Sequence, residues 1–162
     1  MKKNYFSKRS YYCFFIIILI FFFDRFTKQY VIYLNELDQN SDLFSSAYLN
    51  IYLVWNEGIA FGLLSFNEED FYNIISLIIF LVVLLILILL IKEKNIKKYP
   101  LSMILGGAIS NFYDRIKFSA VPDFIDFHIG NFHWFIFNIA DIFITLGIIY
   151  LIVLDRTYLK NN

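Results

Sequence analysis

Four stretches dominated by apolar residues follow one another along the chain, and each is long enough to form a helix. They cover about residues 11–31, 71–91, 99–116 and 132–154. The second stretch has no charged residue over 21 positions, which is typical of a helix that spans a membrane. Polar residues interrupt the other three. The pattern predicts a membrane all-α bundle of four transmembrane helices, built as a single domain over residues 1–162.

The segment between the first two stretches has a different pattern. Residues from about 44 to 65 are rich in Tyr, Ile, Val and Trp. Within this segment, Ala47–Leu64 carries Asn56, Glu57 and Gly58 near its middle, which indicates two short strands around a turn. We therefore expect a small extracytoplasmic β-sheet region on the outer surface of the membrane.

The distribution of charged residues predicts the orientation. Lysine and arginine gather before the first stretch, between the second and the third, and after the fourth. In contrast, residues 29–70 contain seven acidic residues and no lysine or arginine. Because cytoplasmic loops are enriched in basic residues, we predict that both termini and residues 92–98 are cytoplasmic. Residues from about 35 to 70 and from 116 to 131 would then lie outside.

The composition agrees with a membrane protein and excludes several other classes. Hydrophobic residues make up 59% of the chain and charged residues 17%, whereas soluble domains contain about 45–50% and about 25%. The formal net charge is zero, which argues against a basic nucleic-acid-binding protein. The basic N-terminus and the apolar run after it are not followed by a small-x-small cleavage site. We therefore expect an uncleaved first helix.

Three carboxylates lie at the same predicted depth. Asp24, Asp114 and Asp141 each stand 15 or 16 residues from a basic residue at the cytoplasmic end of the same stretch. This separation corresponds to about 22–24 Å along a helix, in a hydrocarbon core about 30 Å thick. Ionisable residues within a membrane are costly and are candidates for function. The three residues therefore predict one polar site that opens towards the outside.

Some of these residues also have a structural interpretation. Asp24 and Lys28 are four residues apart and could form an ion pair on one helix face. Asp114 stands next to Arg115 and could belong to a local charge network. Asp141, in contrast, has no basic neighbour in its predicted span, so we expect it to have a function.

The residue types narrow the possible chemistry. The chain has two histidines, His128 and His133, without a His-Glu-x-x-His motif, and we predict no metal site. Cys13 is the only cysteine and lies near the cytoplasmic end of the first stretch. No Gly-x-Ser-x-Gly motif is present. Carboxylate chemistry without a metal remains.

Two carboxylates that are held close together can share a proton. One then acts as a base towards water while the other donates a hydrogen bond to a carbonyl group, which suits amide hydrolysis. Asp141 is one candidate. Asp123 and Asp126 both lie near the predicted outer surface. The pattern alone does not choose between them.

Five motifs occur in a fixed order along the chain. They are Asp24-Arg-Phe-Thr-Lys28, Asn56-Glu-Gly-Ile-Ala-Phe-Gly62, Gly106-Gly-Ala-Ile-Ser-Asn-Phe-Tyr-Asp-Arg115, Val121-Pro-Asp-Phe-Ile-Asp-Phe127 and Phe137-Asn-Ile-Ala-Asp141. With these motifs the chain resembles lipoprotein signal peptidase, also called signal peptidase II, a bacterial integral-membrane aspartic protease. The resemblance covers nearly the whole chain.

The resemblance implies a role for individual residues. Asp123 and Asp141 match the catalytic pair. Residues that match positions binding the substrate or shaping the site are Asn56, Gly62, Asn111, Asp114, Arg115 and Asn138. Asp24 and Lys28 match a structural motif of the first helix. No cofactor, metal or nucleic acid is implied.

The resemblance also implies a substrate and a location. The substrate is a prolipoprotein whose cysteine already carries diacylglycerol, and the cut falls just before that cysteine. The enzyme is a multi-pass protein of the bacterial cytoplasmic (inner) membrane, in contact with membrane lipid, and its active site faces the extracytoplasmic side.

Two other classes explain part of the pattern. A non-enzymatic small membrane scaffold would account for the apolar stretches and the charges of the first helix. It would not account for Asp141 without a basic partner, or for Asp123 just outside. A proton-coupled transporter subunit would use buried acids, but the short chain and the lack of an internal repeat argue against it.

Overall fold

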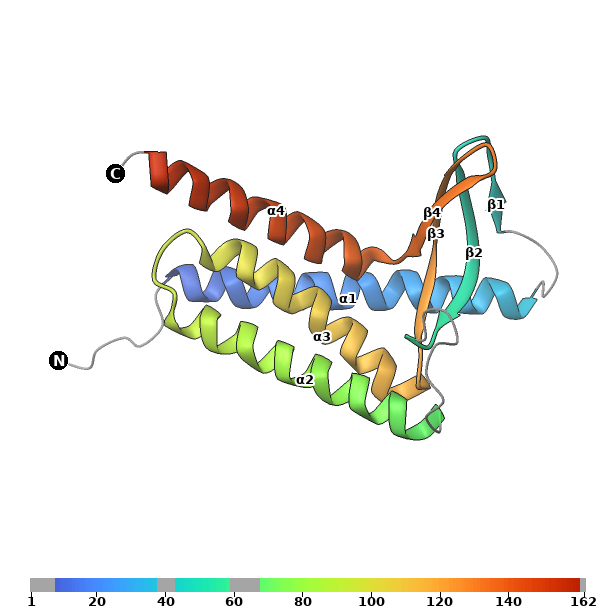
Figure 1. Ribbon diagram of the computed structural model, residues 1–162, viewed down its shortest axis with the longest axis horizontal. Coiled ribbons are helices and arrows are strands. Elements are labelled where there is room, and N and C mark those ends of the chain that lie inside the picture. Colours follow the sequence, from blue (N-terminus) through green and yellow to red (C-terminus); the bar gives the residue numbers. More distant parts are fainter. Residues whose placement is uncertain (1–7, 38–42, 59–67, 161–162) are drawn as a thin grey trace.

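The computed structural model describes residues 8–37, 43–58 and 68–160. The helices are α1 (Lys8–Leu37), α2 (Glu68–Lys92), α3 (Lys98–Phe118) and α4 (Ile139–Lys160). The strands are β1 (Phe44–Ser45), β2 (Leu49–Asn56), β3 (Val121–Ile129) and β4 (Phe132–Phe137). The helices run lengthwise along the molecule, and the strands stand across one end of them (Figure 1).

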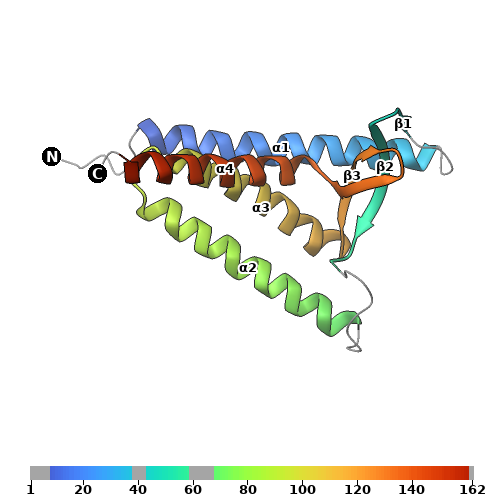
Figure 2. The same ribbon diagram turned by 45° about the horizontal axis from the view of Figure 1, so that its top comes forward.

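Helix α3 is central to the bundle and contacts the other three helices. Glycines allow close packing, since a Cβ added at Gly107 would lie 2.6 Å from the carbonyl oxygen of Ala140 in α4. Small residues commonly permit such close approach between membrane helices. Leu90, Leu101 and Leu105 form a buried cluster in the half of the bundle away from the sheet. Helix α2 diverges from the other helices towards the sheet end (Figure 2).

The close contact of Gly107 with α4 predicts the effect of adding one methyl group at this position. Gly107→Ala should lower the stability of the purified protein by about 1–3 kcal/mol, because the backbone of α4 must move away from α3. The shift should also lower cleavage activity, since Ala140 precedes Asp141. Thermal unfolding in detergent measures the first effect. Ile116→Val is a matched control at an exposed position of α3, and equal melting temperatures for the two variants would contradict the prediction.

The four strands form one antiparallel sheet in the order β1-β2-β3-β4. The sheet packs against α1 and the beginning of α4 through a cluster around Val31, Phe124 and Ile125. Helix α3 ends at Phe118. The next residue, Ser119, has a left-handed backbone (φ 57°), and its N–H donates to the carbonyl oxygen of Arg115 at 3.0 Å. This turn leads the chain from α3 into β3, and β4 leads it back into α4, so the β3–β4 hairpin is joined to the bundle at both of its ends.

The sheet includes residues that the sequence analysis assigned to the fourth span, and that prediction is wrong. Phe132–Phe137 is the strand β4, and α4 begins only at Ile139. Asp141 therefore lies in the first turn of α4, not nine residues inside a helix beginning at 132. A short apolar run does not by itself distinguish a strand from a helix.

The outer segment agrees with the first half of the prediction of two strands around the Asn56 turn. Leu49–Asn56 forms one strand, and its described partners are β1 and β3. Gly58 follows this strand with φ +81°, which is consistent with a turn. The second predicted strand falls largely on residues 59–64, which lie outside the described residues, as does Gly62.

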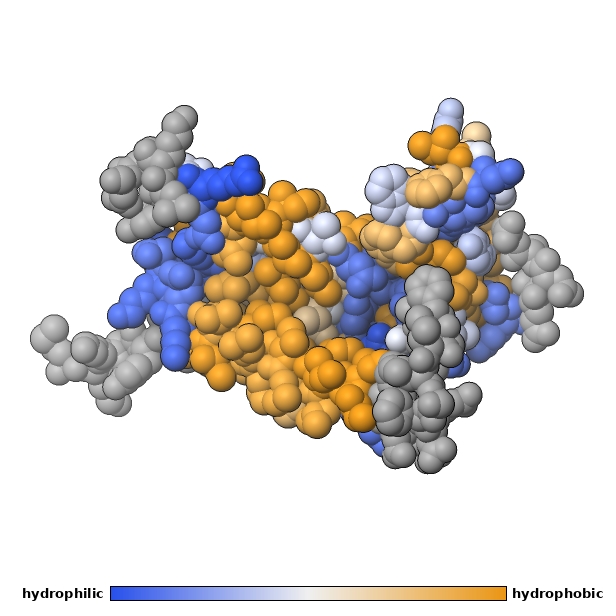
Figure 3. Space-filling model, viewed as in Figure 1, coloured by the Kyte–Doolittle hydropathy of each residue, from blue (hydrophilic) through white to orange (hydrophobic). Residues whose placement is uncertain are grey.

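The surface of the helices is strongly apolar (Figure 3). Large hydrophobic side chains are exposed on α1, α2 and α4, for example Phe22, Leu85 and Ile152. Among the described residues, two helices, Lys8–Leu37 and Tyr72–Lys92, are long and apolar enough to cross a membrane. The part of the chain that the structure describes thus contains four helices and a four-stranded sheet, and two of these helices meet that criterion.

Candidate active site

A cluster of buried polar residues fills the space where α1, α3 and α4 meet the sheet. Its fully or almost fully buried members are Asp24, Lys28, Ser110, Asp114, Asp123 and Asn138. Because isolated polar groups are costly to bury, each is expected to have a partner. The contacts of the cluster bring together most of the site residues predicted from the sequence.

Asp123 lies on β3 and is held by two amide side chains. Asn138 donates from Nδ2 to its Oδ1 at 2.6 Å, and Asn56 donates from Nδ2 to its Oδ2 at 2.8 Å. Burial raises the pKa of Asp123 to about 6, because the charged form loses hydration. The two hydrogen bonds oppose this rise in pKa, whereas the nearby charge of Asp141 adds to it.

Asp141 is fixed at the start of α4 by reciprocal hydrogen bonds with Asn138. The backbone N–H of Asn138 donates to Oδ2 of Asp141 at 3.2 Å, and the N–H of Asp141 donates to Oδ1 of Asn138 at 3.1 Å. This is the capping-box arrangement of a helix N-terminus. Asn111 on α3 donates from Nδ2 to Oδ1 of Asp141 at 2.8 Å. Asn138 therefore contacts both Asp123 and Asp141.

Lys28 is completely buried, and Asn111 connects its ammonium group to Asp141. Its Nζ lies 2.7 Å from Oδ2 of Asp24 and 2.8 Å from Oδ2 of Asp114, and it donates to Oδ1 of Asn111 at 2.7 Å. The three contacts use the three donors of an ammonium group. The bond from Lys28 to Asn111 leaves the Asn111 amide nitrogen facing Asp141, so Lys28 orients a neighbour of the site.

Asp24 connects three helices. Its Oδ1 accepts the backbone N–H of Ala140 at 2.8 Å, and its Oδ2 accepts the hydroxyl of Ser110 at 2.6 Å. A carboxylate near the N-terminus of a helix is electrostatically favourable. Asp24 thus fixes the beginning of α4 from α1. Ser110, which the sequence analysis did not select, lies inside the 106–115 motif that contains Asn111.

The predicted ion pair between Asp24 and Lys28 is present, and Asp114 belongs to a charge network as expected, although its partner is not the neighbouring Arg115. Asp114 instead forms ion pairs with Arg25 and Lys28 of α1. Consecutive residues on a helix point in different directions, which explains why neighbours in the sequence do not meet. The guanidinium of Arg115 packs close to Gly58, after β2.

Asp126 lies three residues beyond Asp123 on β3 but has different neighbours. Its Oδ2 accepts from Nδ2 of Asn50 at 3.3 Å and lies 2.8 Å from Nδ1 of His133. Of the two aspartates of β3, it is Asp123 that the structure places against Asn138 and its partner Asp141.

A cavity of about 210 Å³ opens beside Asp141. Its walls are made by β4 and the first turns of α4, from Phe135, Phe137, Asp141, Ile142, Thr145 and Leu146. The lining is mostly apolar, and Asp141 supplies the carboxylate in it. Two aspartates held by a common amide residue, one of them lining such a cavity, are the arrangement expected of an aspartic hydrolase.

Similarity to known proteins identifies the family of this chain. Residues 16–156 match the family model described as Signal peptidase (SPase) II. The chain is 47% identical over 135 residues to the lipoprotein signal peptidase of Pelagibacter ubique, a match that covers 83% of this chain and 81% of that protein. It is 38% identical over 128 residues to the lipoprotein signal peptidase of Anaplasma phagocytophilum, covering 76% and 80%. This chain belongs to the signal peptidase II family.

A solved structure agrees with this assignment. The chain superimposes on a protein described as a bacterial membrane enzyme with a TM-score of 0.72 and 31% sequence identity, covering 93% of this chain and 90% of that one. The chain is therefore similar in both sequence and fold to membrane enzymes of bacteria.

Proposed function

We propose that this chain is an aspartic endopeptidase that removes signal peptides from prolipoproteins, with Asp123 and Asp141 as its catalytic pair. The family membership supports the reaction and the substrate class. The hydrogen bonds of Asn138 to both carboxylates carry the assignment of the pair. Asn56 of β2 donates to the other oxygen of Asp123, and Asn111 of α3 donates to the other oxygen of Asp141.

The proposed reaction needs one carboxylate and one carboxylic acid. The ionised aspartate accepts a proton from water, whose oxygen attacks the carbonyl carbon of the scissile peptide bond. The protonated aspartate donates its proton to the carbonyl oxygen, which gives a neutral tetrahedral intermediate. Proton transfer to the amide nitrogen then accompanies cleavage of the C–N bond. Asn56, Asn111 and Asn138 keep the two carboxyl groups oriented during these steps.

The raised pKa of Asp123 predicts how the rate depends on pH. The cleavage rate should fall as the pH rises above about 6, because the pair then loses the proton that it must share. Asn56 donates a hydrogen bond that favours the ionised form of Asp123. Asn56→Ala should therefore raise the pKa of Asp123 further and move the alkaline decline to higher pH, which a kcat–pH profile measures.

Asn50 provides a matched control for this experiment, since it lies on the same strand as Asn56 but donates to Asp126. Asn50→Ala should leave the position of the alkaline decline unchanged. An equal displacement in both variants, or none in Asn56→Ala, would contradict the assigned role of Asp123.

We also propose that the substrate cysteine carries diacylglycerol and that the cut falls just before this cysteine. The apolar cavity beside Asp141 and the exposed apolar surface of the helices support entry of the substrate from the lipid phase. A lipid anchor confines the substrate to the membrane, and binding of this remote group can contribute to the rate of cleavage.

The requirement for lipid is directly testable. A precursor with a diacylglyceryl-modified cysteine should be cleaved at least about tenfold faster than the same precursor with a free cysteine. The measurement is the initial rate with purified enzyme in detergent, at matched substrate concentrations. Equal rates on the two forms would exclude entry by way of the lipid anchor.

We further propose four membrane spans with both termini in the cytoplasm. The basic clusters support this orientation. Contacts between Arg9 and Lys94, and between Lys97 and Asp155, join the ends of the helices on the side away from the sheet. The sheet would then face the extracytoplasmic side.

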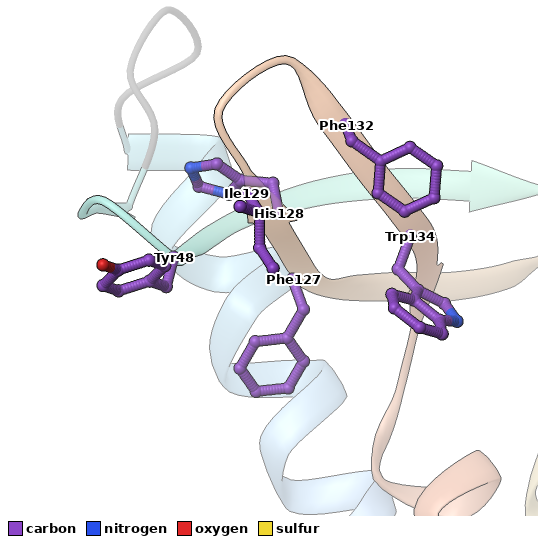
Figure 4. A pocket seen from close by; sticks show the side chains of 6 residues that line it. All are labelled: Tyr48, Phe127, His128, Ile129, Phe132 and Trp134. Atoms are coloured by element: carbon purple, nitrogen blue, oxygen red, sulfur yellow. The ribbon is translucent and has the colours of Figure 1, made fainter.

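The residues near the tip of the β3–β4 hairpin support a position of the sheet at the boundary between membrane and water. Several aromatic side chains surround a cavity there (Figure 4), namely Tyr48, Phe127, Phe132 and Trp134. Tryptophan and tyrosine are enriched where a membrane meets water. We therefore place the sheet at the extracytoplasmic interface, next to the predicted site.

A further inference from the structure

The β3–β4 hairpin brings the two histidines of the chain together. His128 and His133 are opposite one another in the antiparallel register, and their rings are stacked with centroids 5.0 Å apart. The register of β3 shifts between Asp126 and His128, and the two side chains nevertheless lie close together, with Nδ1 of His128 3.9 Å from Oδ2 of Asp126. In Figure 4 the ring of His128 points away from that of Phe127, the intervening residue.

The three side chains present their ligand atoms to one another. Nδ1 of His133 lies 2.8 Å from Oδ2 of Asp126, and Nδ1 of His128 lies 3.9 Å from the same oxygen. The three ligand atoms all lie within 4.8 Å of each other. Ligands bind Zn²⁺ at about 2.0–2.2 Å, which places them roughly 3–3.5 Å apart around a tetrahedral ion. Small side-chain movements would be enough to reach that geometry.

Two atoms of this cluster lack a hydrogen-bond partner among the described residues. They are Oδ1 of Asp126, whose side chain is fully buried, and Nδ1 of His128. Leaving such buried groups without a partner is costly. A cation placed between them would interact favourably with the buried carboxylate and with the free ring nitrogen.

The surroundings suit a bound ion. Asn50 and Tyr52 of β2 donate to Oδ2 of Asp126 and orient its carboxylate, as residues around metal ligands commonly do. The side chain of His133 is 49% exposed, which leaves a path for the ion and room for a water ligand.

We propose that Asp126, His128 and His133 bind one divalent transition-metal ion of the Zn²⁺ type, which joins β3 to β4 and stabilises the sheet. The sequence predicts no metal, because Asp126 joins the two histidines only through the pairing of β3 with β4. The site uses neither Asp123 nor Asp141, so the ion has no part in the proposed cleavage reaction.

Zinc titration of the purified protein, carrying an affinity tag without histidine, tests the proposal. Isothermal titration should show one Zn²⁺ bound per chain, and Zn²⁺ should raise the melting temperature. His128→Ala and His133→Ala should each weaken binding by about tenfold or more and remove the increase in melting temperature. Asp155→Asn, a carboxylate near the opposite end of the molecule, is the matched control and should bind Zn²⁺ like the unchanged protein.

Two results would overturn the proposal: no Zn²⁺ binding by the unchanged protein, or unchanged affinity in both histidine variants. The variant at the half-exposed His133 keeps the test decisive even if the His128 variant does not accumulate. A cleavage assay in chelator separates this proposal from the proposed function. Cleavage should continue without the ion, so failure of metal binding and failure of peptidase activity are independent results.

Discussion

Asp141→Asn is expected to reduce cleavage by at least about 10³-fold, because a general acid–base group typically contributes about 10²–10⁴-fold and the amide cannot replace it. The substitution keeps the size of the side chain, and the asparagine oxygen can still accept the hydrogen bond from Asn111, while the weaker bond from the Asn138 N–H is lost. The site should therefore stay assembled while its chemistry is lost. The measurement is the rate of cleavage of a lipidated precursor by purified variant protein.

Asp155→Asn gives a control for this experiment on the same helix. Asp155 is half exposed and pairs with Lys97, far along α4 from the site. This variant should cleave the precursor at nearly the normal rate. If Asp141→Asn also retained most of the normal rate, Asp141 would have no catalytic role.

Lys28→Met is expected to have the second large effect, on stability as well as on activity. The change leaves the buried carboxylates of Asp24 and Asp114 without the ammonium that they share. Removal of one partner from a buried ion pair typically costs about 3–5 kcal/mol. Asn111 also loses the contact that directs its amide group towards Asp141. The melting temperature and the cleavage rate, measured on the same preparation, should both decrease.

The matched control is Lys97→Met, which removes a lysine from a partly exposed ion pair with Asp155. Exposed pairs are typically worth at most about 1 kcal/mol, so this variant should unfold near the normal temperature. Equal melting temperatures for the two lysine variants would contradict the supporting role of Lys28.

Much of the architecture could be predicted from local patterns. The uncharged stretch at 71–91 was enough to predict a helix there. The basic clusters were enough to predict that residues 92–98 lie at the same end of the molecule as the N-terminal and C-terminal helix ends. The beginning of α4 could not be predicted, because the aromatic residues of β4 are as apolar as a membrane helix. Their strand conformation depends on pairing with β3, which is a tertiary contact.

The site was predictable to a similar extent. The equal depth of Asp24, Asp114 and Asp141 pointed to one polar cluster, and all three do take part in a connected network. The i,i+4 pair of Asp24 with Lys28 was predictable, whereas the contacts of Lys28 with Asp114 and Asn111 were not, since they join two different helices. The grouping of Asp126 with His128 and His133 depends likewise on the register of the hairpin.

The choice between the two aspartates of β3 tests the central claim most directly. Asp123→Asn, Asp126→Asn and Asp141→Asn should be compared for cleavage of one lipidated precursor at equal amounts of folded protein. The proposed pair predicts that Asp123→Asn and Asp141→Asn are both inactive, while Asp126→Asn retains a substantial rate. Substantial cleavage by Asp123→Asn, together with loss of cleavage in Asp126→Asn, would contradict the pairing of Asp123 with Asp141.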